Sequence, residues 1–423
     1  MPTWLIIVIT AAASYLLSLV VRVLTSREKK ITHEIEHLFS VADDQFLRSM
    51  SGLLPPTVLG GNRITALTNG DNVFPAMLEA IGTARHTVTF ETFIYWQGEL
   101  GRQFADALIG RARAGIKVHV LLDWLGTKKM DPDSIKSMKD AGVHVERYHP
   151  LRWYNLCRAN NRTHRKLLIV DGTVGFTGGA GIADVWSGNA QDPDHWRDSH
   201  FKIEGPVVAQ CQAAFMDNWL KTRSEVLQSG EYFPEVAPAG SHRAQVFMSS
   251  PSEGSESARL MYLLSIASAA KSIRIASAYF VPDDLSVQTL VQARRRGVTV
   301  QIIVPGEHID TKVTGRASRS RWGPPLEAGA SIYEYRPTMY HCKVLIVDDL
   351  WTSVGSANFD NRSFRLNDEA NLNVYDADFA REQAEAFERD KQQAHRITLE
   401  QWTNRPRHEK LHERLAGLLR SQL

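Results

Sequence analysis

The fold is decided by a stretch that the sequence contains twice, HRKLLIVDGTVGFTGGAG from His164 to Gly181 and HCKVLIVDDLWTSVGSAN from His341 to Asn358. A constant offset of 177 residues (341 minus 164) relates the shared positions, which are His164 and His341, Lys166 and Lys343, Asp171 and Asp348, and Gly178 and Gly355. One His-x-Lys pattern in a strand is a weak signal, whereas two copies at one offset indicate a duplicated unit. We therefore expect a body built from two equivalent halves.

The sequence around each copy repeats as well. TVTFETFIYW (Thr87–Trp96) is matched by SIRIASAYFV (Ser272–Val281), and ARAGIKVHVLL (Ala112–Leu122) is matched by ARRRGVTVQII (Ala293–Ile303). The hydrophobic spacing predicts a strand, a helix, a second strand and a hairpin in each unit. This alternation is typical of the α/β class, in which mixed sheets carry helices on their faces. We expect halves at residues 57–230 and 231–395, related by a pseudo-two-fold axis, with a site where they meet.

Alternate side chains of a strand lie on the same face of its sheet. His164 and Lys166 therefore share a face, and so do His341 and Lys343. Cys342 points the other way and is expected to be a small buried core residue. Each half thus presents an imidazole and an ammonium group together.

Asp171 and Asp348 complete the repeated motif, so they are grouped with the candidate catalytic residues. Their place at the hairpin turns, on the face opposite the histidines, favours a structural role from turn chemistry.

The second hairpin adds a hydroxyl and an amide. If its turn is centred between residues 349 and 350, His341 lies opposite Asn358 and Lys343 lies opposite Ser356. A sheet face with these groups suits a phosphodiester anion, because the lysines supply charge while Ser356 and Asn358 supply neutral hydrogen bonds.

Two histidines can divide the work of phosphoryl transfer. One neutral imidazole attacks phosphorus, and the other, protonated, gives its proton to the leaving alkoxide. A reference pKa of about 6.5 allows both states near pH 7. Asp198 in WRDSH and Glu369 in RLNDEAN are candidates to orient the rings through the second ring nitrogen. No three-carboxylate cluster accompanies either motif, so we expect neither a metal nor another cofactor, and the lysines replace the cation.

The amino terminus predicts a membrane anchor over residues 1–24. Met1 to Val21 carries no charged side chain, and 18 to 21 helical residues span about 27 to 32 Å, close to the thickness of a bilayer core. A cleaved signal peptide is the alternative, but no basic residue precedes Trp4. The basic residues that follow the apolar run place the body on the cytoplasmic side; they are Arg22, Arg27, Lys29 and Lys30.

Four further segments have two interpretations each. Residues 25–56 are predicted to form a juxtamembrane linker, in which the apolar spacing of Ile31 to Leu54 fits either a helix at the membrane or one packed on the body. The tail, residues 396–423, places four leucines on one helical face, which suits an interfacial helix or, slightly better, docking on the body. The basic segments 148–165 and 312–322 either bind anionic headgroups or are solvated loops.

Composition excludes several classes of protein. The chain has 423 residues, with 49 basic against 47 acidic side chains and a formal net charge of +2. This balance argues against a protein that wraps nucleic acid. The three cysteines, Cys157, Cys211 and Cys342, form neither a disulfide framework nor a zinc site, and they suit a reducing compartment.

The repeated motif resembles that of the phospholipase D superfamily, whose signature is HxKxxxxD followed by small residues and Asn. Within it the chain is similar to the bacterial cardiolipin synthases over nearly its whole length after about Val58. The stretches that carry the likeness include LTNGDNVFPAMLEAI, ETFIYW, NRTHRKLLIVDG, WRDSHFKIEGPVV, SANFDNRSFRLNDEANL and ITLEQW.

The resemblance implies a metal-independent reaction through a phosphohistidine. It makes His164 the nucleophile and His341 the general acid and then base, with Lys166, Lys343 and Asn358 binding phosphate and Asp198 and Glu369 orienting the histidines. One departure stands out, since Gly181 occupies the position that Asn358 has in the second copy. The halves are therefore not chemically equal, and the assignment of the nucleophile to the first half rests on the resemblance alone.

The activity implied is transfer of a phosphatidyl group from phosphatidylglycerol to a second phosphatidylglycerol, with release of glycerol, at a bacterial inner membrane. The alternatives are hydrolysis of phospholipids to phosphatidic acid, a nuclease of the same superfamily, or a membrane-binding module without activity. The anchor and the charge disfavour the nuclease, and the intact motifs disfavour the inactive module. The choice between phosphatidylglycerol and phosphatidylethanolamine as donor, and the oligomeric state, are left open.

Overall fold

The computed structural model describes residues 2–25, 31–151, 160–251 and 256–423. The strands before residue 230 are β1 (Leu59–Thr68), β2 (Thr87–Thr92), β3 (Lys117–Asp123), β4 (His144–Tyr148), β5 (Arg162–Thr163), β6 (Leu167–Val170), β7 (Val174–Gly178) and β8 (Ser199–Glu204). Those after it are β9 (His242–Ser249), β10 (Ser272–Ser277), β11 (Phe280–Val281), β12 (Thr299–Pro305), β13 (Ser331–Tyr335), β14 (Lys343–Val347), β15 (Trp351–Gly355), β16 (Phe359–Asp360), β17 (Asn367–Tyr375) and β18 (Ala394–Ile397).

The helices alternate with these strands. They are α1 (Thr3–Thr25), α2 (Asp44–Leu53), α3 (Gly70–Thr83), α4 (Glu99–Arg113), α5 (Pro132–Asp140), the 3-10 helix η2 (Asp184–Trp186), α6 (Val208–Arg223), α7 (Ser257–Ala267), α8 (Asp284–Arg295), α9 (Lys312–Arg319), α10 (Gly323–Glu327), α11 (Asn361–Arg365), α12 (Ala377–Gln392), α13 (Leu399–Asn404) and α14 (Arg407–Gly417).

One large mixed sheet contains two sets of strands in the same order. From its edge inward the first set runs β4-β3-β2-β6-β7-β8-β1, and the second runs β13-β12-β10-β14-β15-β17-β9, with β18 outside β13. The sets meet where β1 pairs antiparallel with β9. In the first set, β6 of the motif hairpin pairs antiparallel with β2, and β2 pairs parallel with β3. In the second set, β14 pairs antiparallel with β10, and β10 pairs parallel with β12. The predicted mixed α/β fold is confirmed, and its strand order repeats as the sequence does.

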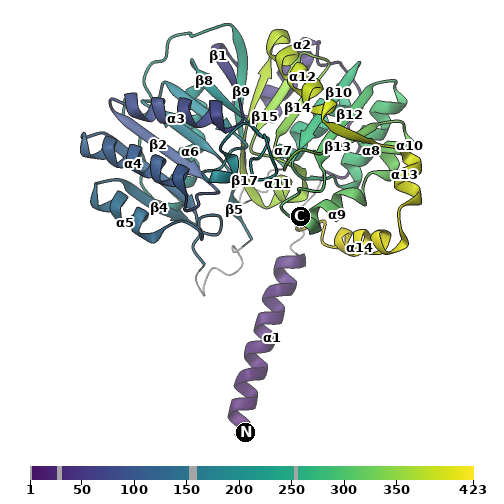
Figure 1. The fold of residues 1–423 in the computed structure, drawn as a ribbon, viewed down its shortest axis with the longest axis horizontal. Coiled ribbons are helices and arrows are strands. Elements are labelled where there is room, and N and C mark those ends of the chain that lie inside the picture. The colour runs from purple at the N-terminus through teal and green to yellow at the C-terminus, as the bar shows by residue number, and fades with distance from the viewer. Residues whose placement is uncertain (1, 26–30, 152–159, 252–255) are drawn as a thin grey trace.

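Helices cover both faces of the sheet. On one face α6 and α12 share a core that includes residues of both halves, among them Phe215 and Trp219 of α6 and Phe387 of α12. On the other face the first half buries its own cluster under α3 and α4, and the second half buries another under α7 and α8. Figure 1 shows the two halves side by side, with the central strands between them. The shared core holds the motif hairpins of the two halves in a fixed relation.

The register of the second hairpin differs by one residue from the prediction. Val344 pairs with Val354 and Val347 with Trp351, so the turn contains Asp348, Asp349 and Leu350. The cause is local, since Asp348 and Asp349 both adopt the left-handed conformation, with φ of 55° and 52°, and close a three-residue turn. The predicted pairing of His341 with Asn358 and of Lys343 with Ser356 is therefore wrong.

Helix α1 forms where the sequence predicts an anchor, and Figure 1 shows it extending away from the body. Its apolar side chains are exposed, Trp4 by 65% and Leu17 by 65%. Among the described residues, no helix combines the length and the hydropathy needed to cross a bilayer. The assignment of residues 1–24 as a transmembrane anchor is thus not confirmed.

The segment from residue 31 to 54 packs on the body. Only Asp44–Leu53 is helical, and Phe46 of this helix meets Trp351 edge-on at 5.0 Å between ring centroids. The longer helix that the apolar spacing suggested does not form, because residues before 44 run along the second half, where the Val41 N–H donates to the Ser268 carbonyl at 3.0 Å. Of the two readings of this segment, packing on the body is the one observed.

Candidate active site

Each motif histidine contacts a carboxylate from the other half of the chain. Nδ1 of His164 lies 3.0 Å from both carboxylate oxygens of Glu369, and Nδ1 of His341 lies 2.7 Å from Oδ2 of Asp198. All four side chains are buried. The sequence predicted both carboxylates as orienting groups, and the structure adds that the pairs cross between the halves.

The backbone explains the crossing. The short strand β5 pairs parallel with the start of β17, and the His164 N–H donates to the Asp368 carbonyl at 2.9 Å, directly before Glu369. In the same way the His341 N–H donates to the Arg197 carbonyl at 2.8 Å, directly before Asp198. Each histidine is therefore fixed at its own main chain to the residue that precedes its carboxylate.

The two carboxylates are held by different donors. Trp186 Nε1 donates to Asp198 at 2.9 Å, whereas the Ser356 hydroxyl donates to Glu369. Gly179 occupies the position equivalent to Ser356, and a Cβ there would lie 2.1 Å from an oxygen of Asp198. The first half thus needs a glycine where the second has a serine. Ser356, predicted to bind phosphate, uses its hydrogen to support Glu369.

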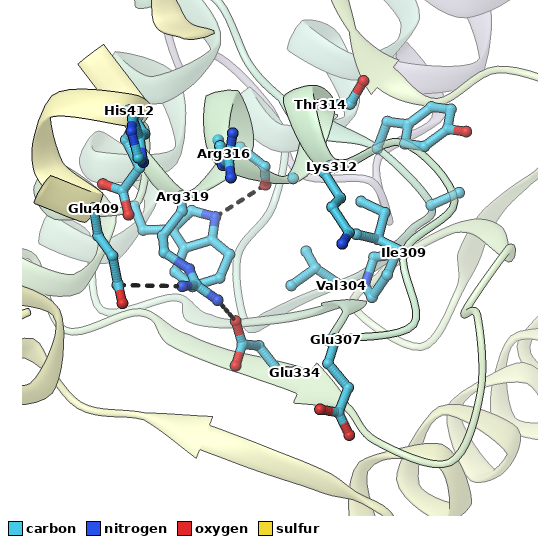
Figure 2. Close-up of a pocket in the computed structure, with 18 of the residues that line it drawn as sticks. Val304, Glu307, Ile309, Lys312, Thr314, Arg316, Arg319, Glu334, Glu409 and His412 are labelled. Atoms are coloured by element: carbon cyan, nitrogen blue, oxygen red, sulfur yellow. Dashed lines mark hydrogen bonds and ion pairs between the residues drawn. The ribbon is translucent and has the colours of Figure 1, made fainter. Parts of the chain in front are cut away.

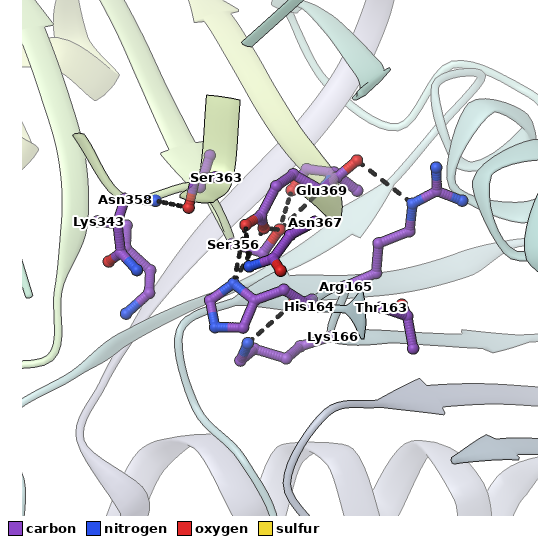
Figure 3. Close-up of polar contacts among 12 residues, drawn as sticks. Thr163, His164, Arg165, Lys166, Lys343, Ser356, Asn358, Ser363, Asn367 and Glu369 are labelled. Carbon is purple, nitrogen blue, oxygen red and sulfur yellow. Dashed lines mark hydrogen bonds and ion pairs between the residues drawn. The ribbon is translucent and has the colours of Figure 1, made fainter. Parts of the chain in front are cut away.

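The motif lysines lie beside the histidines. Lys166 Nζ donates to the His164 carbonyl at 2.7 Å, and Lys343 Nζ donates to the His341 carbonyl at 2.6 Å. Lys343 Nζ also lies 3.0 Å from Nδ1 and 3.3 Å from Nε2 of the His341 ring. Figure 3 shows Lys166 and Lys343 directed into the same space from the two halves. Burial, and next the charge of Lys343, lowers the pKa of Lys166 to about 7. Burial also lowers the pKa of Lys343.

Burial also lowers the pKa values of the two motif histidines. It lowers the pKa of His164 to about 4, with Lys166 adding to the effect while Glu369 opposes it. Burial, and next Lys343, lowers the pKa of His341. Both rings are therefore neutral near pH 7 without a bound anion, so the coexistence of one neutral and one protonated ring needs the charge of a substrate. A neutral ring that donates from Nδ1 to a carboxylate leaves the Nε2 lone pair available to attack an electrophile.

Aromatic rings surround each imidazole. Phe93 meets His164 at 5.4 Å between centroids, and Trp186 and Trp196 meet His341 at 5.3 and 5.5 Å. The repeated motifs alone gave no signal for these rings, although the stretches ETFIYW and WRDSH contain Phe93 and Trp196. The three rings form apolar walls beside the two imidazoles.

Asn358 lies after the end of β15 in the second motif and is drawn in Figure 3. Its backbone N–H donates to the Ser363 hydroxyl at 3.0 Å, and its side-chain oxygen has no hydrogen-bond partner among the described residues. At the equivalent Gly181, a Cβ would lie 2.8 Å from Cβ of Ile94. Close packing therefore excludes a second amide, and the site is asymmetric.

Asp171 and Asp348 lie at the far ends of the hairpins. The Asp171 carboxylate accepts hydrogen bonds from the backbone N–H groups of residues 85, 86 and 87, and Asp348 accepts from those of residues 270, 271 and 272. Each ties its turn to the start of the neighbouring strand. This geometry supports the structural role.

The remaining candidates are placed as follows. Cys342 is buried, and burial raises the pKa of its thiol to about 12, so it is a core residue. Cys157 and residues 152–159 of the first basic segment lie outside the described residues. Among the residues that are described, no three metal-ligating side chains come together.

Known proteins match both halves of the chain. A family model described as "Cardiolipin synthase, PLD-like domain" matches residues 77–218 and 262–391. The chain is 37% identical over 334 residues to cardiolipin synthase 1 of Bacillus anthracis, covering 77% of this chain and 65% of that protein. It is 34% identical over 374 residues to cardiolipin synthase A of Pseudomonas putida (strain GB-1), covering 88% and 78%. The chain thus spans slightly less than two thirds of the length of the first of these relatives.

A solved structure shares the fold. Phosphatidylserine synthase of Haemophilus influenzae Rd KW20 superposes with a TM-score of 0.67 at 15% identity, over 90% of this chain and 100% of that one.

Proposed function

Because the chain belongs to the family described as cardiolipin synthase, PLD-like domain, we propose that it is a metal-independent phosphatidyltransferase. The reaction moves a phosphatidyl group from one phosphatidylglycerol to the hydroxyl of a second. The products are cardiolipin and glycerol. The observation that supports this proposal is that Nδ1 of each motif histidine lies within hydrogen-bond distance of a carboxylate from the other half, with the lysine of its own motif beside it.

The first step forms a phosphohistidine. Nε2 of His164 attacks phosphorus, the bond from phosphorus to the glycerol oxygen breaks, and His341 gives its proton to that oxygen. The bound phosphodiester anion raises the pKa of His341 and so allows it to carry this proton. Lys166, Lys343 and the Asn358 amide bind the non-bridging oxygens, where charge accumulates.

The second step reverses these roles. His341, now neutral, takes the proton of the acceptor hydroxyl, whose oxygen attacks phosphorus and releases His164. Glu369 and Asp198 keep Nδ1 of each ring protonated and its Nε2 aimed at the phosphorus throughout. The aromatic rings of Phe93, Trp186 and Trp196 reduce access of water to the intermediate, which favours transfer over hydrolysis.

Attachment to the cytoplasmic side of a bacterial inner membrane stays a prediction. The exposed apolar side chains of α1 support it, together with the basic residues that follow α1 in the sequence. The domain limits at residues 57, 230 and 395 are proposals of the same kind.

The experiment that tests the proposal uses the full chain in mixed micelles with phosphatidylglycerol labelled separately in its acyl chains and its terminal glycerol. We expect acyl label in cardiolipin and one free glycerol for each cardiolipin formed. Label in phosphatidic acid without cardiolipin would replace the transferase by a phospholipase D. Cleavage of DNA in a parallel, salt-sensitive assay would instead favour the nuclease.

A further inference from the structure

A cavity of about 450 Å³ lies at the end of β12, between α9 and α14. The two helices pack together, and Ala317 of α9 and Ala416 of α14 belong to one small buried cluster. The halves differ here, because residues 124–131 connect β3 directly to α5, whereas residues 306–322 connect β12 to α10 and include α9. Helix α9, which forms one wall of the pocket, therefore has no equivalent in the described first half.

Most acidic groups in this pocket already have partners. Arg319 pairs with Glu334 and lies 3.9 Å from Glu409, and Arg405 pairs with Glu413 at 2.7 Å. Figure 2 shows Arg319 and Lys312 reaching into the space from opposite sides.

Two cations of the lining have no such partner. Within the described parts of the chain, the side chains of Lys312 and Arg316 make neither an ion pair nor a hydrogen bond, although both line the cavity. Glu307, Glu334, Glu409 and Glu413 also line the pocket, so it combines two cations that have no direct partner with several carboxylates. This combination suits a ligand with both a phosphate and hydroxyl groups.

The pocket adjoins the candidate active site. Ala278 and Tyr279 line it, and the Ala278 N–H donates to the Cys342 carbonyl at 3.0 Å, between His341 and Lys343 in the chain. The preceding residue, Ser277, pairs with Lys343 in the sheet. The pocket therefore lies next to the segment that carries His341 and Lys343, and in the proposed reaction His341 takes the proton of the acceptor hydroxyl.

The outer surface of α14 indicates the source of the phosphate. The leucines of the apolar row on α14 and the turn that follows it are 52% to 77% exposed; they are Leu411, Leu415, Leu418 and Leu419. Basic residues flank this row at Lys410 and Arg414. An exposed apolar face with basic flanks is typical of a helix at a bilayer surface. The pocket thus lies behind a helix suited to contact lipid, where a headgroup can enter while its acyl chains stay in the membrane.

We propose that this pocket binds the headgroup of the acceptor lipid, with Lys312 and Arg316 on its phosphate and the Glu334 and Glu409 carboxylates near the hydroxyl that does not react. This inference rests on the proposed function and extends it. Cardiolipin formation brings two lipid phosphates to one enzyme, and the motif lysines bind only the one that reacts. The second phosphate needs cations of its own.

The test compares two acceptors that differ in the second phosphate. A Lys312→Ala, Arg316→Ala double variant of the full chain is assayed for cardiolipin formation at subsaturating phosphatidylglycerol and for exchange of labelled glycerol into phosphatidylglycerol. Glycerol has no phosphate, so only the first reaction uses the pocket. Loss of a charged hydrogen bond corresponds to about a tenfold change. We therefore expect cardiolipin formation to fall about tenfold or more and glycerol exchange to change by less than about twofold.

A matched control removes two exposed arginines elsewhere, Arg102→Ala with Arg381→Ala, and is expected to leave both rates near wild type. Equal loss of both reactions, or loss of neither, in the pocket variant would overturn the acceptor assignment. Inorganic phosphate at millimolar concentration tests the other source of phosphate. The pocket would be a site for free phosphate instead if two results came together: the ion alters both wild-type reactions but neither reaction of the pocket variant, and the pocket variant makes cardiolipin at the normal rate. Wild-type protein that performs neither reaction would contradict the proposed function itself.

Discussion

The Nδ1 atom of His341 lies 2.7 Å from Oδ2 of Asp198, a residue that precedes it by 143 positions and belongs to the other half of the molecule. The His164–Glu369 pair repeats this relation in the opposite direction. Neither half can therefore orient its own histidine, and the duplicated unit works only as a pair. This dependence makes the site sensitive to groups that never touch phosphorus.

Replacing Asp198 by Asn should lower kcat strongly while the protein stays folded. The amide can offer an N–H to Nδ1 of His341 and so favour the wrong ring tautomer. In a Ser-His-Asp triad such a change lowers kcat about 10⁴-fold, and we expect a loss of at least about 10²-fold here. Steady-state cardiolipin synthesis and a thermal unfolding curve measure the two effects. The exposed Asp378→Asn variant serves as control, and a near-normal kcat for Asp198→Asn would remove the orienting role.

The motif aspartates should behave differently from the histidines. Asp171→Ala deletes a carboxylate that accepts three backbone N–H groups, so the free energy of unfolding should fall by about 1 to 3 kcal/mol. The rate of cardiolipin synthesis, measured well below the unfolding transition, should stay within about threefold of wild type. Chemical denaturation and the same lipid assay test both statements. A folded variant without activity would return Asp171 to the catalytic group.

We expect the kcat/KM for phosphatidylglycerol to decrease at high pH because of the motif lysines. Because burial and the charge of Lys343 lower the pKa of Lys166 to about 7, its ammonium group loses a proton as pH rises through that value. The kcat/KM for phosphatidylglycerol should then fall above about pH 7, since the phosphate loses a cation. Lys166→Arg keeps its charge over this range, so its descending limb should move to higher pH. An unchanged limb in that variant would mean that another group titrates.

Helix α1 should control attachment to lipid without affecting chemistry. Deletion of residues 1–24 removes the exposed apolar side chains that extend from the body. We expect the shortened chain to lose flotation with phosphatidylglycerol vesicles and to keep its rate in mixed micelles within about threefold, because α1 contributes none of the site residues. Unchanged flotation would place the lipid contact elsewhere, with the exposed leucines of α14 as the next region to test.

The repeat made much of this molecule predictable. The offset between His164 and His341 placed both motifs in equivalent strands, and Asp198 and Glu369 could be named as orienting groups. Which carboxylate meets which histidine could not be read from the sequence, because it depends on β5 and β17, which pair across 200 residues of chain. The predicted hairpin register was wrong for a local reason, since Asp348 and Asp349 both adopt the left-handed conformation and lengthen the turn from two residues to three. The roles of Ser356 and Gly179 depend on the different side-chain lengths of Glu369 and Asp198, which meet these residues only in the folded chain.

The most direct test of the shared site is to trap the covalent intermediate. His341→Ala protein is mixed with a phosphatidyl ester whose leaving group needs no proton, such as p-nitrophenol, then quenched and mapped by mass spectrometry. The account predicts a phosphatidyl adduct on His164 that accumulates, no adduct in His164→Ala, and unfolding curves close to wild type for both variants. A stable adduct on His341 in the His164→Ala protein, formed as fast as in wild type, would mean that the two imidazoles serve separate sites and would contradict it.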